Sequence, residues 1–264
     1  MISYESYLRE SAIPRAEIDR FLDPHEPNWA RFDPELGYVL GNSLLRNGAG
    51  GCLTLSTAGA NGARTCALYA ERPCRINTYG NSFTECHQVS DHETWQAYLA
   101  AHLGEPIRNF GVGGYGVYQA YRRLLRTEAG PDGAEYVMLY IWGDDHYRSV
   151  MRCRHVAFHR WWDRAGGRLL HGNYWANLEM DLDAGRLVER PSLLPTPESL
   201  YRMADPEFLV ETLRDDLMLQ MTAYTDGVTE DVDRPRLNRL AEVLGCAPLR
   251  AEDAEESRRK VSRI

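Results

Sequence analysis

The stretch that decides the fold is RINTYGNSFT, residues 75–84. Its beginning has the composition of a short β-strand that ends at Gly80. Ser82 follows directly, at a tight turn from this strand into a helix. A serine on such a turn is exposed and can act as a nucleophile, and the start of the helix would stabilise negative charge beside it.

The pattern of strand followed by helix recurs on the C-terminal side of this stretch. Residues 106–110 predict a second strand, and residues 135–142 a third that is apolar nearly throughout, as a buried parallel strand should be. A capping box at residues 90–93 starts the helix after the first strand, and Gly104 ends it. This helix has its apolar residues at helical spacing: Trp95, Tyr98, Leu99 and Leu103. Further helices are expected over residues 117–125 and 150–165. The series predicts an α/β domain with a parallel sheet and right-handed crossovers.

The chain on either side is less regular. Turn residues between short β-prone pieces predict a hairpin within residues 51–75. We therefore expect residues 1–74 to form an N-terminal extension and hairpin packed on an α/β domain of residues 75–264. The C-terminal part predicts strands around the turn 183–185, helices starting at Asp205 and Asp233, and a helix opening within 251–264.

Composition excludes several classes of protein. The 264 residues are 44% hydrophobic and 26% charged, which is typical of a globular protein, and no apolar run approaches the ~20 residues of a membrane span. A net charge of −8 gives no general attraction to nucleic acid or anionic lipid. Without a signal segment, we expect a cytoplasmic protein with reduced cysteines. The oligomeric state stays open.

Three motifs follow the three predicted strands: GNSFT at 80–84, NFGVGGYG at 109–116 and WGDDH at 142–146. In parallel α/β sheets the ligand crevice lies at the carboxyl ends of the strands, so these motifs should converge. Gly114 can present a bare backbone N–H to an oxyanion. The candidates for contacting a substrate are Asn81, Tyr115, Trp142 and Asp145. The two aromatic residues among them suit either a rim for a sugar ring or the core.

This arrangement resembles the SGNH (GDSL-like) hydrolase superfamily over residues 75–148. The likeness is closest to members with a Gly-Asp-Ser-Phe-Thr block and a Gly-x-x-Gly-Tyr-Gly block. It implies a three-layer, flavodoxin-like α/β/α sandwich that hydrolyses esters, often acyl or acetyl groups on sugars or lipids, without a cofactor. By this resemblance Ser82 is the nucleophile, the Ser82 and Gly114 N–H groups hold the oxyanion, and Asp144 occupies the position usually held by an asparagine donor.

The sequence departs from the family pattern at three points. Asn81 replaces an aspartate, and asparagine makes similar turn hydrogen bonds. Asp144, when ionised, only accepts hydrogen bonds. A protonated Asp144 could donate, or a loop shift by one residue could bring Asp145 or a backbone N–H to the site. The Asp-x-x-His block is absent, so we expect that the chain lacks the family's C-terminal segment. The base is then a histidine outside the chain or His146, oriented by Asp144 or Asp145.

Three functions remain open from the residues. The first is an ester hydrolase that acts through an acyl-Ser82 intermediate on a small-molecule ester. The second is a binding module or pseudoenzyme that keeps the crevice but not the chemistry, and the third is an acyltransferase with the same nucleophile. Minor alternatives are a metal clamp by His155 and His159, which more simply belong to an amphipathic helix, and a nucleophilic Cys86, which is more simply a packed thiol.

Overall fold

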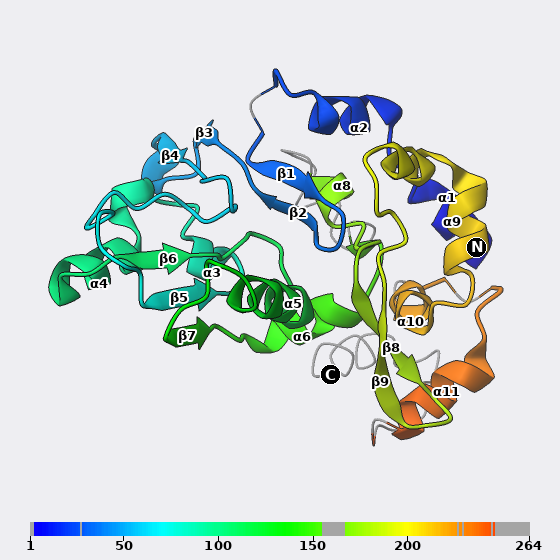
Figure 1. Cartoon of the computed structure of the whole chain (residues 1–264). Coiled ribbons are helices and arrows are strands. Elements are labelled where there is room, and N and C mark those ends of the chain that lie inside the picture. Colours follow the sequence, from blue (N-terminus) through cyan, green and yellow to red (C-terminus); the bar gives the residue numbers. More distant parts are fainter. Residues whose placement is uncertain are drawn as a thin grey trace. The chain divides into compact units, whose positions relative to one another are not determined.

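The computed structural model describes residues 3–26, 28–154, 167–225, 227–228, 230–243 and 245. The chain divides into two compact units (Figure 1). We call Phe21–Asp145 the central unit, and Met1–Arg20 together with His146–Ile264 the terminal unit. The boundary expected between residues 74 and 75 falls inside the central unit.

The central unit is built on a three-stranded parallel sheet of order β6-β5-β7. These strands are β5 (Ile76–Tyr79), β6 (Ile107–Asn109) and β7 (Tyr136–Leu139). Ile76 in the middle strand is paired with Ile107 on one side and Tyr136 on the other. A mixed α/β fold with a parallel sheet is therefore confirmed.

Helices cover both faces of this sheet and contact neighbouring residues of β5. The helices within the central unit are α3 (Ser82–Glu85), α4 (Trp95–Leu103), α5 (Val117–Glu128) and the 3-10 helices η1 (Ala49–Gly51) and η2 (Asp91–Glu93). Gln96 of α4 donates to the Thr78 hydroxyl at 3.2 Å. The Tyr79 hydroxyl donates to Glu128 of α5 at 2.5 Å. Because neighbouring strand residues point to opposite faces, α4 and α5 lie on opposite faces of the sheet.

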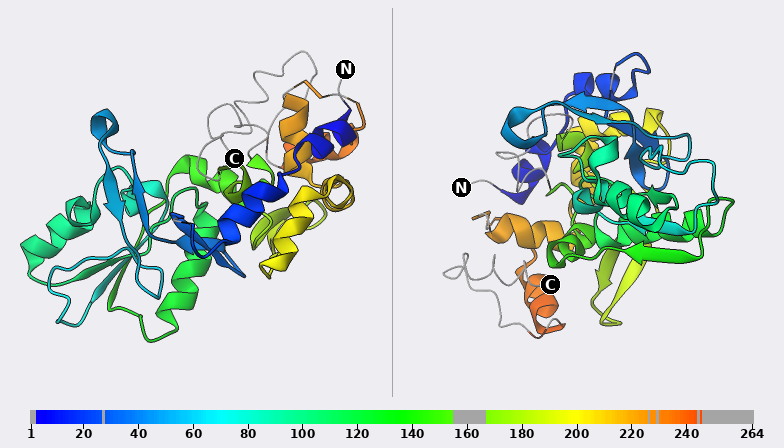
Figure 2. Two further views of the ribbon diagram at one scale, coloured as in Figure 1. Left: turned by 90° about the horizontal axis from the view of Figure 1, so that it is seen from above. Right: turned by 90° about the vertical axis from the view of Figure 1, so that its left-hand side faces the viewer.

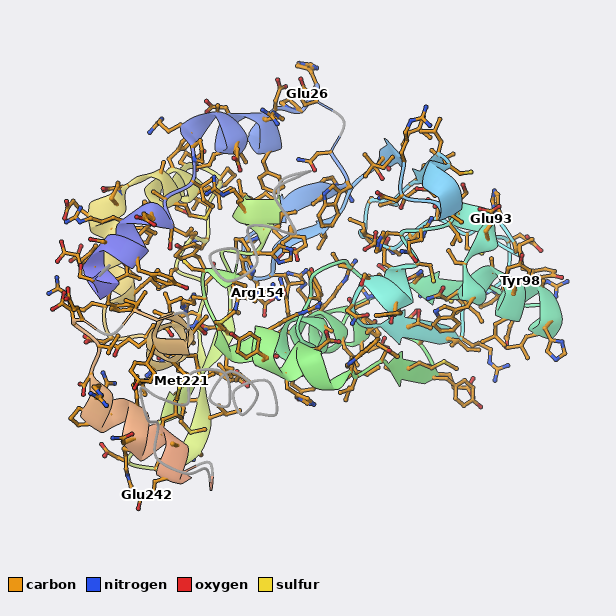
Figure 3. The ribbon with its side chains drawn as sticks, turned by 180° about the vertical axis from the view of Figure 1, so that it is seen from behind. Glu26, Glu93, Tyr98, Arg154, Met221 and Glu242 are labelled. Carbon is orange, nitrogen blue, oxygen red and sulfur yellow. The ribbon has the colours of Figure 1, made fainter. Side chains whose placement is uncertain are left out.

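The apolar face expected for α4 is wrong for most of its residues, and only Leu99 of that face packs against the core. The capping box at Ser90 forms as expected but starts η2, and Thr94 caps α4. Tyr98 is 69% exposed (Figure 3), whereas Ala97 and Ala100 are buried. Small side chains let the helix approach the sheet closely, so packing selects the alanine face over the larger apolar residues.

The third strand is also not the buried strand that was expected. β7 is shorter than residues 135–142, and Tyr136, Val137 and Met138 are exposed. In the part of the chain that the structure describes, β7 pairs only with β5. An edge strand keeps fewer neighbours, so its apolar composition does not mean burial here.

Two antiparallel pairs precede the sheet in the central unit (Figures 1 and 2). They are β1 (Ala30–Asp33) with β2 (Gly37–Leu40), and β3 (Ser43–Leu45) with β4 (Thr54–Ser56). The hairpin expected within residues 51–75 is confirmed in a short form, because Ala58 pairs antiparallel with Arg64 around a turn that contains Gly59 and Gly62. The N–H of Arg64 also donates to the Asn109 carbonyl at 2.8 Å.

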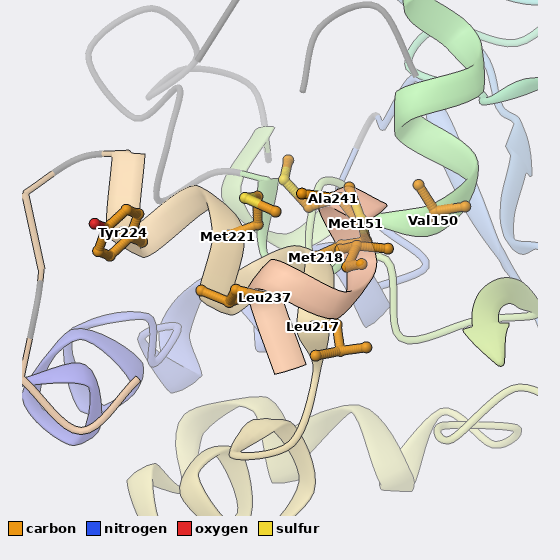
Figure 4. Packing of buried hydrophobic residues seen from close by; sticks show 9 residues of the cluster. Val150, Met151, Leu217, Met218, Met221, Tyr224, Leu237 and Ala241 are labelled. Atoms are coloured by element: carbon orange, nitrogen blue, oxygen red, sulfur yellow. The ribbon is translucent and has the colours of Figure 1, made fainter. Parts of the chain in front are cut away.

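The terminal unit is mainly helical. Its elements are α1 (Tyr4–Glu10), α8 (Gly167–Leu170), β8 (Asn177–Asp181), β9 (Arg186–Arg190), η3 (Glu198–Ala204), α9 (Pro206–Leu213), α10 (Leu217–Thr225) and α11 (Arg234–Val243); α2 (Arg15–Leu22) and α6 (Gly143–Val150) cross its boundaries. The strands around the turn 183–185 and the Asp205 cap are confirmed. Met218 and Met221 belong to its core (Figure 4). Leu240 belongs to the same core.

Two of the expected helices lie largely or wholly outside the described residues, namely 150–165 and 251–264. Among the helices that are described, none has the length and apolar character to cross a membrane.

Candidate functional site

The three motifs meet at the carboxyl ends of the parallel strands. Beyond β6, the Val112 N–H donates to the Gly80 carbonyl at 3.0 Å. Beyond β7, the Tyr140 N–H donates to the Tyr79 carbonyl at 2.8 Å. The backbone therefore holds the first residues of all three loops side by side.

Ser82 is the first residue of α3 and is half-buried. Gly80 makes the turn before it: its φ is +154°, and a Cβ there would lie 2.3 Å from Thr84 Oγ1. Because α3 has only four residues, it carries a small dipole, contrary to the expected help from the helix start. Stabilisation of an anion here depends on individual N–H groups. In the central unit no described acceptor takes the Ser82 N–H or its hydroxyl proton.

Asn81 joins the first and third motifs. Its side chain accepts from the Phe83 N–H at 2.8 Å, which caps α3, and donates to Asp145 Oδ2 at 2.7 Å. Asn81 is 3% exposed and Asp145 2%. Both were expected to contact substrate, and the structure places them together but leaves little of either side chain accessible.

The glycine-rich loop after β6 lies against α3. A Cβ on Gly111 would be 2.4 Å from the Glu85 nitrogen, so only glycine permits this approach. The Gly113 N–H donates to Glu85 Oε2. Gly114 follows with a φ of +80°, a left-handed conformation that favours glycine. The predicted oxyanion donor is therefore carried by a loop fixed to the helix of Ser82.

Tyr115 belongs to the core of the central unit. It is fully buried, its hydroxyl donates to the Tyr38 carbonyl, and the two rings pack edge to face at 5.3 Å. Burial raises the pKa of this hydroxyl. Tyr115 therefore lies in the core and does not form part of an aromatic rim.

Trp142 is different, because it lies in an exposed aromatic cluster beside Ser82. Its ring centroid is 4.7 Å from that of Phe83, and Tyr140 lies 6.0 Å from Phe83. All three side chains are exposed, Phe83 by 56%. Sequence reasoning named Trp142 alone. Tyr140 was missed because the third strand was expected to be buried, and Phe83 was named only as part of the GNSFT motif.

Glu85 is the most perturbed carboxylate near the candidate site. Burial raises its pKa to about 7, while the Gly113 N–H and the buried guanidinium groups of Arg64 and Arg123 act in the opposite direction. Arg64 also donates to the Glu85 carbonyl at 2.6 Å and forms a salt bridge with Asp91 at 2.9 Å. Sequence reasoning missed these residues. The one available signal was an acidic residue three positions after Ser82.

Cys86 ends α3 in a left-handed conformation with φ +61°. Burial raises the pKa of its thiol, so at neutral pH it is a poor nucleophile. The cysteines in the described ranges are all free: Cys52, Cys66, Cys74, Cys86 and Cys153.

The expected base is not among the residues of the central unit. His146 is exposed on α6 and belongs to the terminal unit. The Asp144 side chain, His155 and His159 lie outside the described residues. Among the residues that are described, no group of three or more His, Cys, Asp or Glu could hold a metal ion.

The chain was compared with protein-family models, curated proteins and solved structures. No protein-family model, no curated protein and no solved structure matches the chain.

Proposed function

We propose that this protein is a serine-dependent ester hydrolase with an SGNH-like, three-layer α/β/α core. The observation that carries the proposal is the meeting of three strand-end loops around Ser82. The backbone bonds of Gly80 and Tyr79 hold the loops together, and the Asn81–Asp145 hydrogen bond joins the first loop to the third. Ligands of parallel α/β sheets bind at this edge.

In the proposed reaction the Ser82 Oγ attacks the acyl carbon of an ester, and a histidine takes the hydroxyl proton. His146 is the candidate for this base within the chain. The N–H groups of Ser82 and Gly114 donate to the oxyanion of the tetrahedral intermediate. The alcohol leaves with the proton, and water then hydrolyses acyl-Ser82 by the reverse sequence of steps.

The aromatic cluster of Phe83, Tyr140 and Trp142 supports an ester that carries an apolar or ring-shaped group. Exposed aromatic side chains next to a nucleophile offer a large contact area to an acyl chain or to the apolar face of a sugar. We assign this cluster to substrate binding and the buried pair Asn81–Asp145 to positioning of the loops.

A fluorophosphonate probe tests the proposal directly. We expect a covalent adduct on Ser82, located by mass spectrometry, that is lost in Ser82→Ala and retained in Ser43→Ala, a serine of β3 in the same unit. His146→Ala should then slow labelling, whereas His102→Ala, which removes an exposed histidine of α4, should not. A folded protein that gives no adduct contradicts a hydrolase activity of this chain.

A second candidate is a binding module that keeps the crevice without the chemistry. It is favoured by the lack of any described partner for the Ser82 hydroxyl within the central unit, because an unactivated serine is a feeble nucleophile. This function predicts that an ester or sugar ligand binds equally well to the wild type and to Ser82→Ala, without turnover. Equilibrium binding together with product analysis separates the two, and added alcohol acceptors would reveal acyl transfer.

A further inference from the structure

Glu85 connects the two halves of the candidate site. It is the last residue of α3, which begins with Ser82, and it is 4% exposed. Its Oε2 accepts a hydrogen bond from the Gly113 N–H, directly before Gly114. One buried carboxylate therefore links the turn that carries Ser82 to the loop that carries the predicted oxyanion donor.

The packing around this contact leaves the loop little freedom. A Cβ on Gly111 would lie 2.6 Å from the Thr84 carbonyl carbon, so the loop backbone lies against that of α3. A Cβ on Gly113 would be 3.0 Å from Glu85 Oε2. Asn109 Nδ2 also donates to the Glu85 carbonyl, at 3.3 Å. Two side chains anchor Gly113 in this packing: the Glu85 carboxylate accepts from its N–H, and the Tyr38 hydroxyl donates to its carbonyl at 2.9 Å. Removing the carboxylate would free the N–H side of this residue.

The titratable groups around Glu85 come from three parts of the chain. Arg64 reaches it from the segment after β4, and Arg123 from α5, where its guanidinium also donates to the Gly62 carbonyl at 2.7 Å. The third titratable group is the thiol of the neighbouring Cys86. Arg64 is committed to Asp91 and to backbone carbonyls. The Gly113 N–H is therefore a specific partner of the carboxylate within a region of positive charge.

We propose that Glu85 is a positioning residue, which holds the Gly113–Gly114 segment against the Ser82 turn in the geometry that oxyanion binding requires. The effect on oxyanion binding rests on the proposed ester chemistry, whereas the contact between Glu85 and Gly113 does not. A positioning role predicts that the acceptor atom matters, whereas a packing role predicts that only the volume of the side chain matters.

Two substitutions separate these roles. Glu85→Gln keeps an oxygen acceptor for the Gly113 N–H, and Glu85→Met keeps a similar volume but replaces the oxygen with a weakly accepting sulfur. The matched control is Glu128→Met, which removes a carboxylate that accepts from Tyr79 and Asn77 in the same unit but does not contact the loop. Circular dichroism and thermal melting identify variants that fail to fold.

The first measurement is hydrogen exchange of the peptide covering residues 111–116. We expect this peptide to exchange at least roughly fivefold faster in Glu85→Met than in the wild type, because the variant loses about one hydrogen bond. Exchange in Glu85→Gln should stay close to the wild type, and Glu128→Met should leave this peptide unchanged. Equal exchange in the wild type and Glu85→Met overturns the proposal. If Glu85→Met does not fold, fast exchange of this peptide in folded Glu85→Gln overturns it, and wild-type exchange supports it.

The second measurement is the rate at which the fluorophosphonate labels Ser82. We expect Glu85→Met to be slower by up to about 10²-fold, because a displaced catalytic group costs rates of that order, with recovery in Glu85→Gln. Slow labelling of Glu85→Gln and Glu85→Met alike overturns the role of the acceptor atom. A wild type that is not labelled but keeps the exchange pattern contradicts the ester hydrolase, while supporting the hold of Glu85 on the loop.

Discussion

Asn81 does two things with one side chain: its oxygen caps α3 and its nitrogen donates to Asp145. Asn81 and Asp145 are both buried, so water cannot replace the bond between them at low cost. An asparagine suits this position because an amide carries an acceptor and a donor together. An aspartate would keep the cap but would turn a second carboxylate toward Asp145.

We therefore predict that Asn81→Asp destabilises the protein at neutral pH by about 1–3 kcal/mol, through the lost donor and the repulsion between carboxylates. The loss should shrink at pH 4, because protonation of either of two adjacent carboxylates removes the repulsion between them. Urea unfolding at both pH values measures the difference. Asn42→Ala, which removes an acceptor from the Ala58 N–H in the same unit, should show no such pH dependence.

Glu85 predicts a second pH effect of defined sign. Its pKa is about 7 in the folded protein against an ordinary value of 4.5. The folded state therefore binds the proton more tightly than the unfolded state, so the contribution of Glu85 to stability is full below pH 4.5 and falls as the pH rises to 7. We expect Glu85→Gln to remove a decline of about 3 kcal/mol across this window. Urea unfolding measures the free energy of unfolding of both proteins from pH 4.5 to 8. The same pH dependence in the wild type and in Glu85→Gln would contradict this prediction.

Among the elements, α4 shows how a sheet selects the face of a helix. Its buried residues are Gln96, Ala97 and Ala100, and most of its larger apolar side chains are exposed. Gln96 donates to the Thr84 carbonyl at 2.8 Å, close to Ser82. The helix thus supports the turn of the candidate site with a polar contact and lies close to the sheet through its alanines.

This packing predicts opposite outcomes for two substitutions on α4. Ala100→Leu should cost about 1–3 kcal/mol of unfolding free energy, because the helix has no room for the added methyl groups against the sheet. Tyr98→Ala, on the exposed face, should stay within about 0.5 kcal/mol of the wild type. Urea denaturation measures both values. A larger loss for Tyr98→Ala would mean that the apolar residues form the packed face.

Local signals in the sequence predicted β5, the capping box and the Asp205 cap, because each depends on neighbouring residues. The buried face of α4 and the exposure of β7 could not be predicted in this way, because each depends on which elements lie beside it. The candidate site divides similarly. Convergence of the loops follows from the parallel topology, but the contact of Glu85 with Gly113 joins residues 28 positions apart without any sequence pattern.

At the scale of the whole molecule, each of the two units has a core of its own. In the terminal unit, α10 contributes Met218 and Met221 (Figure 4). The helix α11 contributes Leu240, and all three residues are nearly inaccessible to solvent. In the central unit, Tyr79 and Phe110 stack at 5.1 Å beside the sheet. A substitution in one core should therefore first lower the stability of the unit that contains it.

We predict that Leu240→Ala costs about 2–5 kcal/mol in the terminal unit, through lost burial and a residual cavity. Hydrogen exchange should accelerate in α10 and α11 while the amides of β5 keep their protection. Equal acceleration in β5 would show that the two units unfold as one.

The strand order of the central sheet also has a consequence for the synthesis of the chain. β5 lies between β6 and β7 but leaves the ribosome before both, and Ile76 is paired with Tyr136. At roughly 5–20 residues per second, the ~60 residues that separate these partners take about 3–12 s to translate. During that interval Tyr79 and the Ser82 turn have no completed sheet, so a chaperone that binds apolar segments would find its target in a nascent chain that ends before residue 136.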